Sequence, residues 1–190
     1  MKIGILAIQG DFEAHAKALA RIGVDHSFVR RAGELANLSG VILPGGESTT
    51  HLKVMTEEGL FDAMKQFAGD GGAFFGTCAG TILLAREVHG PAQRSLNLLD
   101  VVVLRNGYGR QLASDVHTNA TQLRKEPLEM VFIRAPIIES VGQGVEILAE
   151  DAGHPVLVRQ GRVLAATFHP ELTSDTTVHE YFLKMSRNGS

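Results

Sequence analysis

The sequence lacks tryptophan, and it contains a single cysteine and two tyrosines among its 190 residues. One cysteine cannot form an internal disulfide, and no apolar run approaches the roughly 18 residues that a membrane-spanning helix needs. The amino terminus, Met1-Lys2-Ile3-Gly4, leads into an apolar strand rather than a signal peptide. We therefore expect a cytoplasmic protein that does not enter the membrane.

Neither sign of charge is in excess, because 18 Lys and Arg residues stand against 21 Asp and Glu residues, for a net charge of -3. The chain has no basic stripe, and the pair Arg30-Arg31 is better explained as a solvated strand end than as a phosphate contact. A nucleic-acid partner is therefore not expected. A chain of this length can bury a core without disulfides or metal, and it contains no linker or repeat, so we expect one domain over residues 1–190.

Apolar runs and helical patterns alternate along the first half of the chain. Short strands are predicted at residues 2–8, 24–30, 41–43 and 73–76, the first of them buried on both faces. Helices are predicted at 12–20, with Asp11 as the cap, and at 49–57, 60–68 and 79–87. The second half instead predicts short strands at 101–104, 128–133, 145–150, 155–160 and 162–168, a polar surface segment at 107–126 and a closing helix at 178–185. This order predicts an α/β fold with a mostly parallel central sheet flanked by helices and with antiparallel additions in the C-terminal half.

The one cysteine stands at a predicted strand-to-helix turn, Gly76-Thr77-Cys78-Ala79-Gly80. Glycines two residues before and two residues after a nucleophile allow the strand to reverse tightly into a helix and lift the side chain between them into a cleft. The amino end of the following helix favours a thiolate. Free cysteines are more often small buried apolar residues, but this glycine frame favours Cys78 as a nucleophile.

A cysteine nucleophile needs a base, and His169 is the one histidine with a neighbouring carboxylate placed to orient its imidazole. It follows a buried strand and precedes Pro170-Glu171, so in extended backbone His169 and Glu171 would share one face and the carboxylate would orient the imidazole. A metal site is less favoured, because the pair has no third ligand at suitable spacing. The other seven histidines are expected at the surface or as helix caps.

Several motifs spread over nearly the whole chain resemble one family. They are Ile3 to Phe12, Leu43-Pro44-Gly45-Gly46-Glu47-Ser48-Thr49-Thr50, the cysteine turn, Tyr108-Gly109-Arg110-Gln111, Phe132-Ile133-Arg134-Ala135-Pro136 and Thr167-Phe168-His169-Pro170-Glu171-Leu172. The chain resembles the class I, or triad, glutamine amidotransferases, and among them the glutaminase subunits of pyridoxal 5'-phosphate synthases. Leu112 to His117 departs from the aromatic and acidic sequence expected there, which bears on that loop and on any partner contact it makes.

The resemblance implies hydrolysis of L-glutamine to L-glutamate and ammonia through a thioester on Cys78, with His169 as the base and Glu171 as its orienting group. It implies an oxyanion hole formed by the backbone N–H groups of Gly46 and Ala79. It also implies a glutamine site made by six residues: Gly46, Glu47, Ser48, Arg105, Ile133 and Arg134. No cofactor and no metal are implied.

The resemblance further implies a partner, a synthase subunit that receives the ammonia and assembles pyridoxal phosphate. Gln9 and Gly10, at the end of the first strand, would line the pocket or meet this partner. Two alternatives remain open from the sequence. One is a stand-alone cysteine amidohydrolase or peptidase with the same turn, and the other is a non-catalytic protein in which Cys78 senses oxidation.

Overall fold

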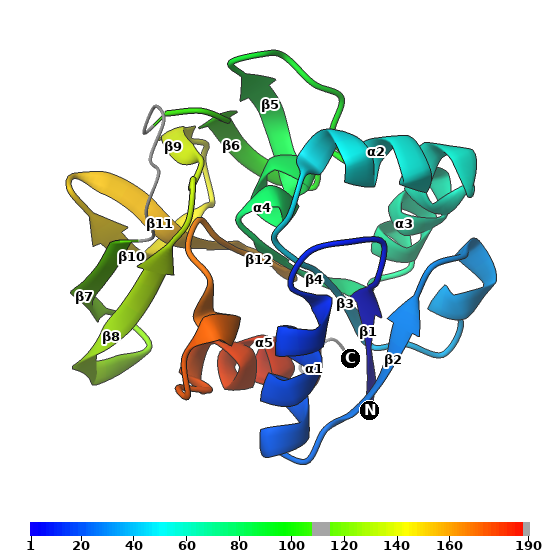
Figure 1. The fold of residues 1–190 in the computed structure, drawn as a ribbon, viewed down its shortest axis with the longest axis horizontal. Helices are drawn as coiled ribbons and strands as arrows, with labels where there is room; N and C mark the ends of the chain where they lie inside the picture. The colour runs from blue at the N-terminus through cyan, green and yellow to red at the C-terminus, as the bar shows by residue number, and fades with distance from the viewer. Residues whose placement is uncertain (108–114, 188–190) are drawn as a thin grey trace.

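A computed structural model describes residues 1–107 and 115–187 as two β-sheets with helices packed around them (Figure 1). The larger sheet has nine strands in the order β2-β1-β3-β4-β12-β11-β10-β7-β8. Its strands are β1 (Lys2–Leu6), β2 (Asp25–Val29), β3 (Gly40–Leu43), β4 (Ala73–Thr77), β7 (Asp115–Thr121), β8 (Arg124–Phe132), β10 (Glu146–Asp151), β11 (His154–Gln160) and β12 (Val163–Ala166). The smaller sheet has the order β5-β6-β9, with β5 (Ala85–His89), β6 (Leu99–Leu104) and β9 (Ile137–Val141).

The first five strands of the larger sheet, from β2 to β12, pair in parallel, and the next four pair antiparallel. This is the predicted arrangement, a parallel sheet with antiparallel additions contributed by the C-terminal half. β12 is the exception within that half, because it returns to the centre and pairs in parallel with β4. That pairing brings the chain after β12 next to the chain after β4.

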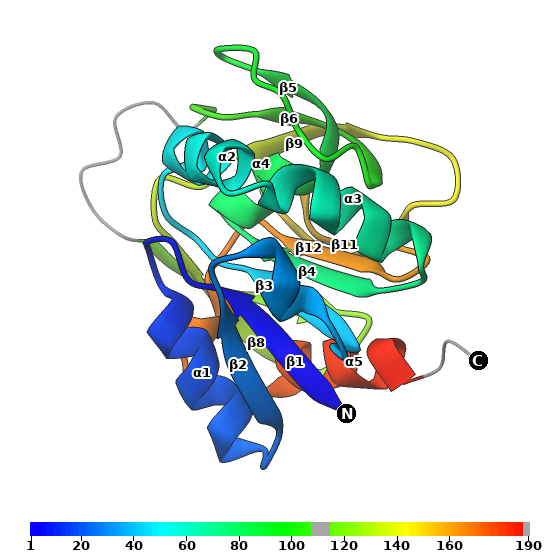
Figure 2. The ribbon, with the colours of Figure 1, turned by 90° about the vertical axis from the view of Figure 1, so that its right-hand side faces the viewer.

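Two layers of helices cover the larger sheet (Figure 2). One side carries α1 (Phe12–Arg21) and α5 (Thr177–Arg187). The other side carries α2 (Ser48–Glu57), α3 (Leu60–Gly69), α4 (Ala79–Leu84) and the smaller sheet, and the 3-10 turns η1 (Ala32–Leu35) and η2 (Pro170–Leu172) complete the structure. Because side chains alternate along a strand, Ile42 and Phe75 join the core under α1 and α5 whereas Val41 and Phe74 join the core under α2 and α3. The central strands are therefore apolar on both faces, as predicted for β1.

The helix predicted at 79–87 is wrong in its second half. α4 ends at Leu84, and Ala85 already has extended backbone that begins β5. The amides of Leu96 and Leu98 donate to the last carbonyl groups of this helix, those of Leu83 and Leu84. Residues 96–98 thus satisfy the last carbonyl groups of α4. Residues 85–89 pair with β6 instead of continuing the helix.

The segment 107–126 was predicted only as a polar surface segment, and most of its described part is β-structure. Residues 115–121 form β7 and residues 124–132 form β8, an antiparallel pair at the edge of the larger sheet. In β7 and in the first half of β8, both faces of the strand are largely exposed and carry polar residues. The alternation of apolar and polar residues that indicates a half-buried strand is therefore missing. Tyr108 to Ser114, which includes one of the motifs above, lies outside the described residues. Among the described residues, no helix is both long and apolar enough to cross a membrane.

Candidate active site

Cys78 lies on the strained turn that the glycine spacing predicts. Its backbone has φ 47° and ψ -103°, between the end of β4 and the first residue of α4. A side chain on Gly76 would lie 2.6 Å from the carbonyl carbon of Gly80, and a side chain on Gly80 would overlap the carbonyl group of Leu43. Both glycines are therefore required by close backbone approach, and the unusual conformation of Cys78 is held by the structure around it.

His169 reaches the same end of the sheet from the neighbouring strand. Ala166 pairs with Thr77, and the amide of Cys78 donates to the carbonyl of Ala166 at 2.9 Å. The amide of His169 in turn donates to the carbonyl of Val131 on β8 at 2.8 Å, which fixes the start of the turn. The parallel pairing of β4 with β12 thus brings the thiol and the imidazole together although 91 positions separate them in sequence, the difference between 169 and 78.

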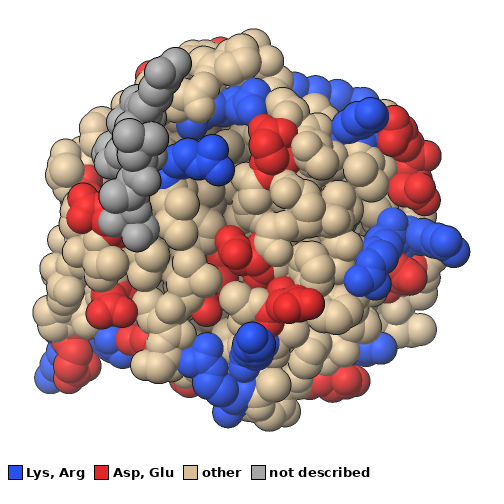
Figure 3. All heavy atoms as spheres, in the orientation of Figure 1, with Lys and Arg blue, Asp and Glu red and all other residues tan. Residues whose placement is uncertain are grey.

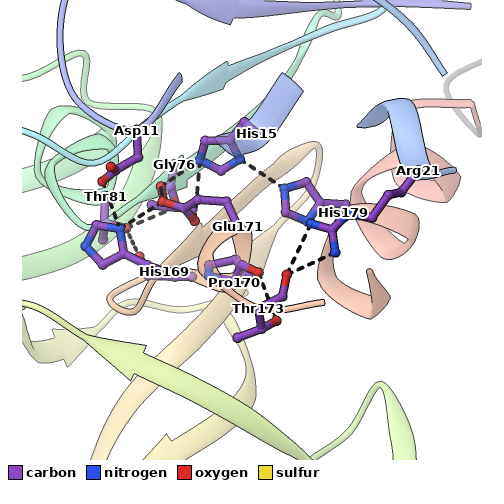
Figure 4. Close-up of polar contacts among 12 residues, drawn as sticks. Asp11, His15, Arg21, Gly76, Thr81, His169, Pro170, Glu171, Thr173 and His179 are labelled. Carbon is purple, nitrogen blue, oxygen red and sulfur yellow. Dashed lines mark hydrogen bonds and ion pairs between the residues drawn. The ribbon is translucent and has the colours of Figure 1, made fainter. Parts of the chain in front are cut away.

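His169 and Glu171 form a buried pair, since His169 Nδ1 lies 2.8 Å from Glu171 Oε1 and each residue is 3% exposed. The expected contact is present, but the expected extended backbone is wrong. Pro170 begins the 3-10 turn η2, and this turn folds Glu171 back toward the imidazole of His169. The pair is drawn in Figure 4.

The charges around His169 favour its protonated form. Burial alone would lower the pKa of His169, but the proximity of Cys78 and Glu171 raises this pKa to about 10. Glu171 occupies Nδ1, and Nε2 has no hydrogen-bond partner among the described residues. The thiol of Cys78 instead lies 3.8 Å from the carbonyl oxygen of Ile133. Burial raises the pKa of Glu171, and the hydrogen bond from His169 opposes that effect. The arrangement supports a protonated imidazole that a carboxylate orients beside the thiol of Cys78.

The thiol opens into a cleft of about 200 Å³ at the carboxyl ends of the parallel strands. This cleft is lined by the residues predicted for the oxyanion hole and for glutamine, namely Gly46, Glu47, Ser48, Ala79, Arg105, Ile133 and Arg134, and also by Asp11, Ile82 and Asn106. A larger hollow of about 680 Å³ lies at the opposite, amino ends of the strands, beside Leu35, Gly72 and Arg162. Ligands of open α/β sheets bind at the carboxyl ends, and Cys78 lies there.

The polar groups of the cleft include one ion pair, in which Arg105 Nη2 lies 3.3 Å from Glu47 Oε1. Glu47 Oε2 also accepts from the amide of Thr50 at 3.0 Å and so caps α2. The carboxylate of Glu47 is half-exposed, so one of its edges is available to a ligand. On the face drawn in Figure 3, acidic and basic side chains are interspersed.

Gly45 and Gly46 connect this cleft to the loop after β1. The amide of Asp11 donates to the carbonyl of Gly45 at 3.4 Å, and Gln9 Nε2 donates to the carbonyl of Glu47 at 3.3 Å. Gly46 has φ +142°, a conformation that residues with a side chain rarely adopt. The two residues expected to line the pocket or meet a partner, Gln9 and Gly10, therefore contact the loop that carries Gly46.

Asp11 was expected to cap α1, and it stands at the N-cap position without the expected side-chain bond. Its side chain makes no capping hydrogen bond, and Oδ2 lies 3.5 Å from His169 Nδ1 (Figure 4). Asp11, His169 and Glu171 therefore supply three potential ligand atoms within 4.8 Å of one another, although residue spacing had indicated no third ligand. Glu171 Oε1 already holds His169 Nδ1 at 2.8 Å, so this nitrogen could bind a metal only by giving up that hydrogen bond.

Three further histidines are buried, contrary to their predicted surface or capping positions. His15, His51 and His179 are each 0% exposed. His51 Nε2 lies 3.1 Å from the carbonyl oxygen of Gln9, while His15 and His179 contact each other behind Glu171. The one local signal for the burial of His15 is its position three residues after Phe12 and four before Leu19, on the apolar face of α1.

Comparison with known proteins shows which family the chain matches. Residues 5–188 match the model of the SNO glutamine amidotransferase family. The chain is 55% identical to the pyridoxal 5'-phosphate synthase subunit PdxT of Koribacter versatilis, over 100% of this chain and 98% of that protein. It is 47% identical to the subunit of the same name from Kosmotoga olearia, over 97% of each chain. A crystal structure of a glutamine amidotransferase superposes with a TM-score of 0.92 at 46% identity, covering 97% of this chain and 98% of that one.

Proposed function

The chain belongs to the SNO glutamine amidotransferase family, and from this premise we propose that it is the glutaminase subunit of a pyridoxal 5'-phosphate synthase. It hydrolyses L-glutamine to L-glutamate and ammonia, and it passes the ammonia to a synthase subunit. The observation that carries the chemistry is the convergence of Cys78, His169 and Glu171 at the cleft. The proposal treats residues 1–190 as one glutaminase domain.

In the first half of the reaction, the thiolate of Cys78 attacks the side-chain amide carbon of glutamine, and the carbonyl oxygen becomes an oxyanion. His169 then gives its Nε2 proton to the amide nitrogen, the carbon–nitrogen bond breaks, and ammonia leaves a thioester on Cys78. Glu171 holds the imidazole in place through Nδ1 in both protonation states.

In the second half, neutral His169 takes a proton from water, and the hydroxide adds to the thioester carbon. The second oxyanion collapses, the carbon–sulfur bond breaks, and the thiolate and imidazolium are regenerated as glutamate leaves. A donor to the oxyanion is needed in both halves. We assign this role to the backbone N–H groups of Ala79 and Gly46. Each donor would stabilise the transition state by on the order of 3 kcal/mol.

Rotation of the Gly45-Gly46 peptide would turn the Gly46 N–H group into or out of the oxyanion hole. Both flanking residues are glycines, so this peptide can rotate at low steric cost. Its carbonyl oxygen accepts from the amide of Asp11, on the loop that also carries Gln9 and Gly10. A partner that docks on Gln9 and Gly10 would therefore act directly on the orientation of the Gly46 N–H group.

Glutamine recognition uses the polar wall of the cleft. The α-ammonium group meets Glu47, and the α-carboxylate meets Arg105 or Arg134 or the backbone amides beside Ser48. Ile133 supplies the apolar contact for the methylene groups. The assignment is supported by all of these residues lining one cleft with Cys78.

Ammonia released into water at neutral pH becomes mostly ammonium, which is not nucleophilic, so the product must reach the synthase subunit through a shielded path. The synthase supplies the second active site and the phosphorylated sugar substrates. We place the reaction in the cytoplasm, because a nucleophilic thiolate has to remain reduced.

Nitrogen transfer in the assembled complex tests this function. With amide-labelled [15N]glutamine, the wild-type complex should incorporate 15N into pyridoxal phosphate, and the complex with Cys78→Ala should not. Both complexes should form pyridoxal phosphate when ammonium salt at high concentration replaces glutamine, which controls for assembly. Cleavage of peptides that excess glutamine does not inhibit would instead favour a stand-alone peptidase.

A further inference from the structure

Two buried histidines lie behind the candidate triad and extend its line of contacts into the core. His15 on α1 and His179 on α5 are each 0% exposed. In Figure 4, Glu171 lies between His169 on one side and His15 on the other, with His179 beyond His15. The mechanism above uses neither His15 nor His179.

The contacts of His15 favour one tautomer of its ring. Thr77 Oγ1 donates to Glu171 Oε1 at 3.4 Å, so its lone pairs are left to accept from His15 Nε2 at 3.1 Å. His15 Nε2 is therefore the donor nitrogen, and its Nδ1 accepts from His179 Nε2 at 3.0 Å. This order satisfies both nitrogens of His15 with neutral rings throughout.

Glu171 has a second oxygen that needs a donor. Oε1 accepts from His169, whereas Oε2 is buried and makes no hydrogen bond of normal geometry within residues 1–107 and 115–187. The approaching donor is His15 Nε2, at 3.5 Å from Oε2. An unpaired buried carboxylate oxygen is costly, so this contact favours the ionised and correctly oriented carboxylate.

The groups around His15 keep it neutral. Burial lowers the pKa of His15, and the charges of His179 and then His169 lower it further. Burial and then the charge of Arg21 lower the pKa of His179 to about 4. The remaining charged groups nearby are Glu171, which faces His15, and Asp11, which faces His169 rather than His15.

We propose that His15 is a positioning residue of the glutaminase reaction, which donates from Nε2 to Thr77 and toward Glu171 Oε2 and so holds the carboxylate that orients His169. His179 fixes the tautomer of His15 that makes this donation possible. The inference depends on the proposed function, because it assigns His15 a role in the same triad. It extends that triad from the cleft into the core between α1 and α5.

Two substitutions test the contacts of the two ring nitrogens of His15 separately. In His15→Gln, the amide nitrogen falls near the Nε2 position and can still donate to Thr77 and Glu171. In His15→Asn, the shorter amide falls near Nδ1 and reaches His179 but not Glu171. Both variants replace a buried ring by a primary amide. Their melting temperatures, compared with that of wild type, therefore measure the loss of stability that the two variants share.

We expect His15→Gln to keep kcat for glutamine hydrolysis, measured with the synthase subunit present, within about threefold of wild type. We expect His15→Asn to lower kcat by about tenfold or more while KM changes by less than about twofold. The pKa of His169, followed in the full chain by NMR of 15N-labelled histidine, should be lower in His15→Asn than in His15→Gln.

Equal values of kcat in the two variants, or an unchanged pKa of His169 in His15→Asn, would overturn the positioning role. The NMR titration needs no substrate, so it separates this inference from the proposed function. If wild type fails to hydrolyse glutamine while the pKa of His169 still differs between the variants, the glutaminase assignment fails and the positioning of Glu171 stands.

Discussion

The backbone amide of Asp11 donates a hydrogen bond to the carbonyl oxygen of Gly45, 3.4 Å away, and so ties the loop after β1 to the loop after β3. These two loops carry Gln9 and Gly10 on one side and Gly46 on the other. Contact between them is close, because a side chain on Gly10 would overlap the carbonyl group of Gly45. The proposed docking residues and the proposed oxyanion donor therefore cannot move independently.

Gly10→Ala should separate these loops and reduce glutamine hydrolysis in the complex by about tenfold or more. Gly10 has φ +85°, so the substitution adds backbone strain to the overlap with Gly45, on the order of 1–3 kcal/mol. Steady-state kinetics and urea unfolding would measure the two effects.

Gly23→Ala is the matched control for this substitution. Gly23 also has positive φ, at +69°, but a side chain there meets no described atom within 4 Å. It should cost about 1 kcal/mol of stability and leave kcat unchanged. Similar loss of activity in both variants would argue against the coupling of the two loops.

The stability contributed by His169 should fall as pH rises. The pKa of His169 is about 10 in the folded chain, against an ordinary value of 6.5. Between these values the folded chain holds a proton that the unfolded chain has lost, so the contribution is fully present below pH 6.5 and is lost as pH rises through about 10.

Urea unfolding of wild type and His169→Asn at pH 6, 8 and 10 would measure this contribution as the difference between the two proteins. Groups that titrate equally in both cancel in that difference. The difference should shrink steadily toward pH 10, and a difference that grows with pH would be inconsistent with a paired imidazolium.

Glu47→Gln should weaken glutamine binding while sparing the chemical step. The change removes a charge that meets Arg105 at 3.3 Å and that we assign to the α-ammonium group of the substrate. KM should rise by about tenfold, with kcat within about threefold of wild type. Because Glu47 is half-exposed, the free energy of unfolding should change by less than about 1 kcal/mol.

Asp62→Asn offers a control for this charge removal. It disrupts another exposed ion pair, with Arg94 at 3.9 Å, and Asp62 does not line the cleft. Neither KM nor kcat should change. An unchanged KM in Glu47→Gln would remove Glu47 from the glutamine site.

Local sequence patterns predicted the parts of the site whose geometry is itself local. The glycines around Cys78 predicted its turn, and the close approach of Gly76 to Gly80 lies within these five residues, although Gly80 is also constrained by Leu43 on β3. The contact of His169 with Glu171 was predicted by proximity in sequence, although a 3-10 turn makes that contact and not extended backbone. The apolar strands β1, β3 and β4 were predicted because both of their faces are buried.

Patterns that depend on distant packing were missed. Asp11 and His15 resemble ordinary helix residues until β4, η2 and α5 close around them, and only then does one face His169 and the other Glu171. Helix α4 was predicted too long, because the chain that caps its end arrives from residues 96–98.

In the proposed reaction, the thiolate of Cys78 cuts the side-chain amide of glutamine. The initial rate of glutamate formation from glutamine, measured for wild type and Cys78→Ala with the synthase subunit at saturation, tests this step. The rate for Cys78→Ala should be at least about a thousandfold below wild type, with unchanged binding to the synthase subunit. Equal rates for the two proteins would show that Cys78 is not the nucleophile.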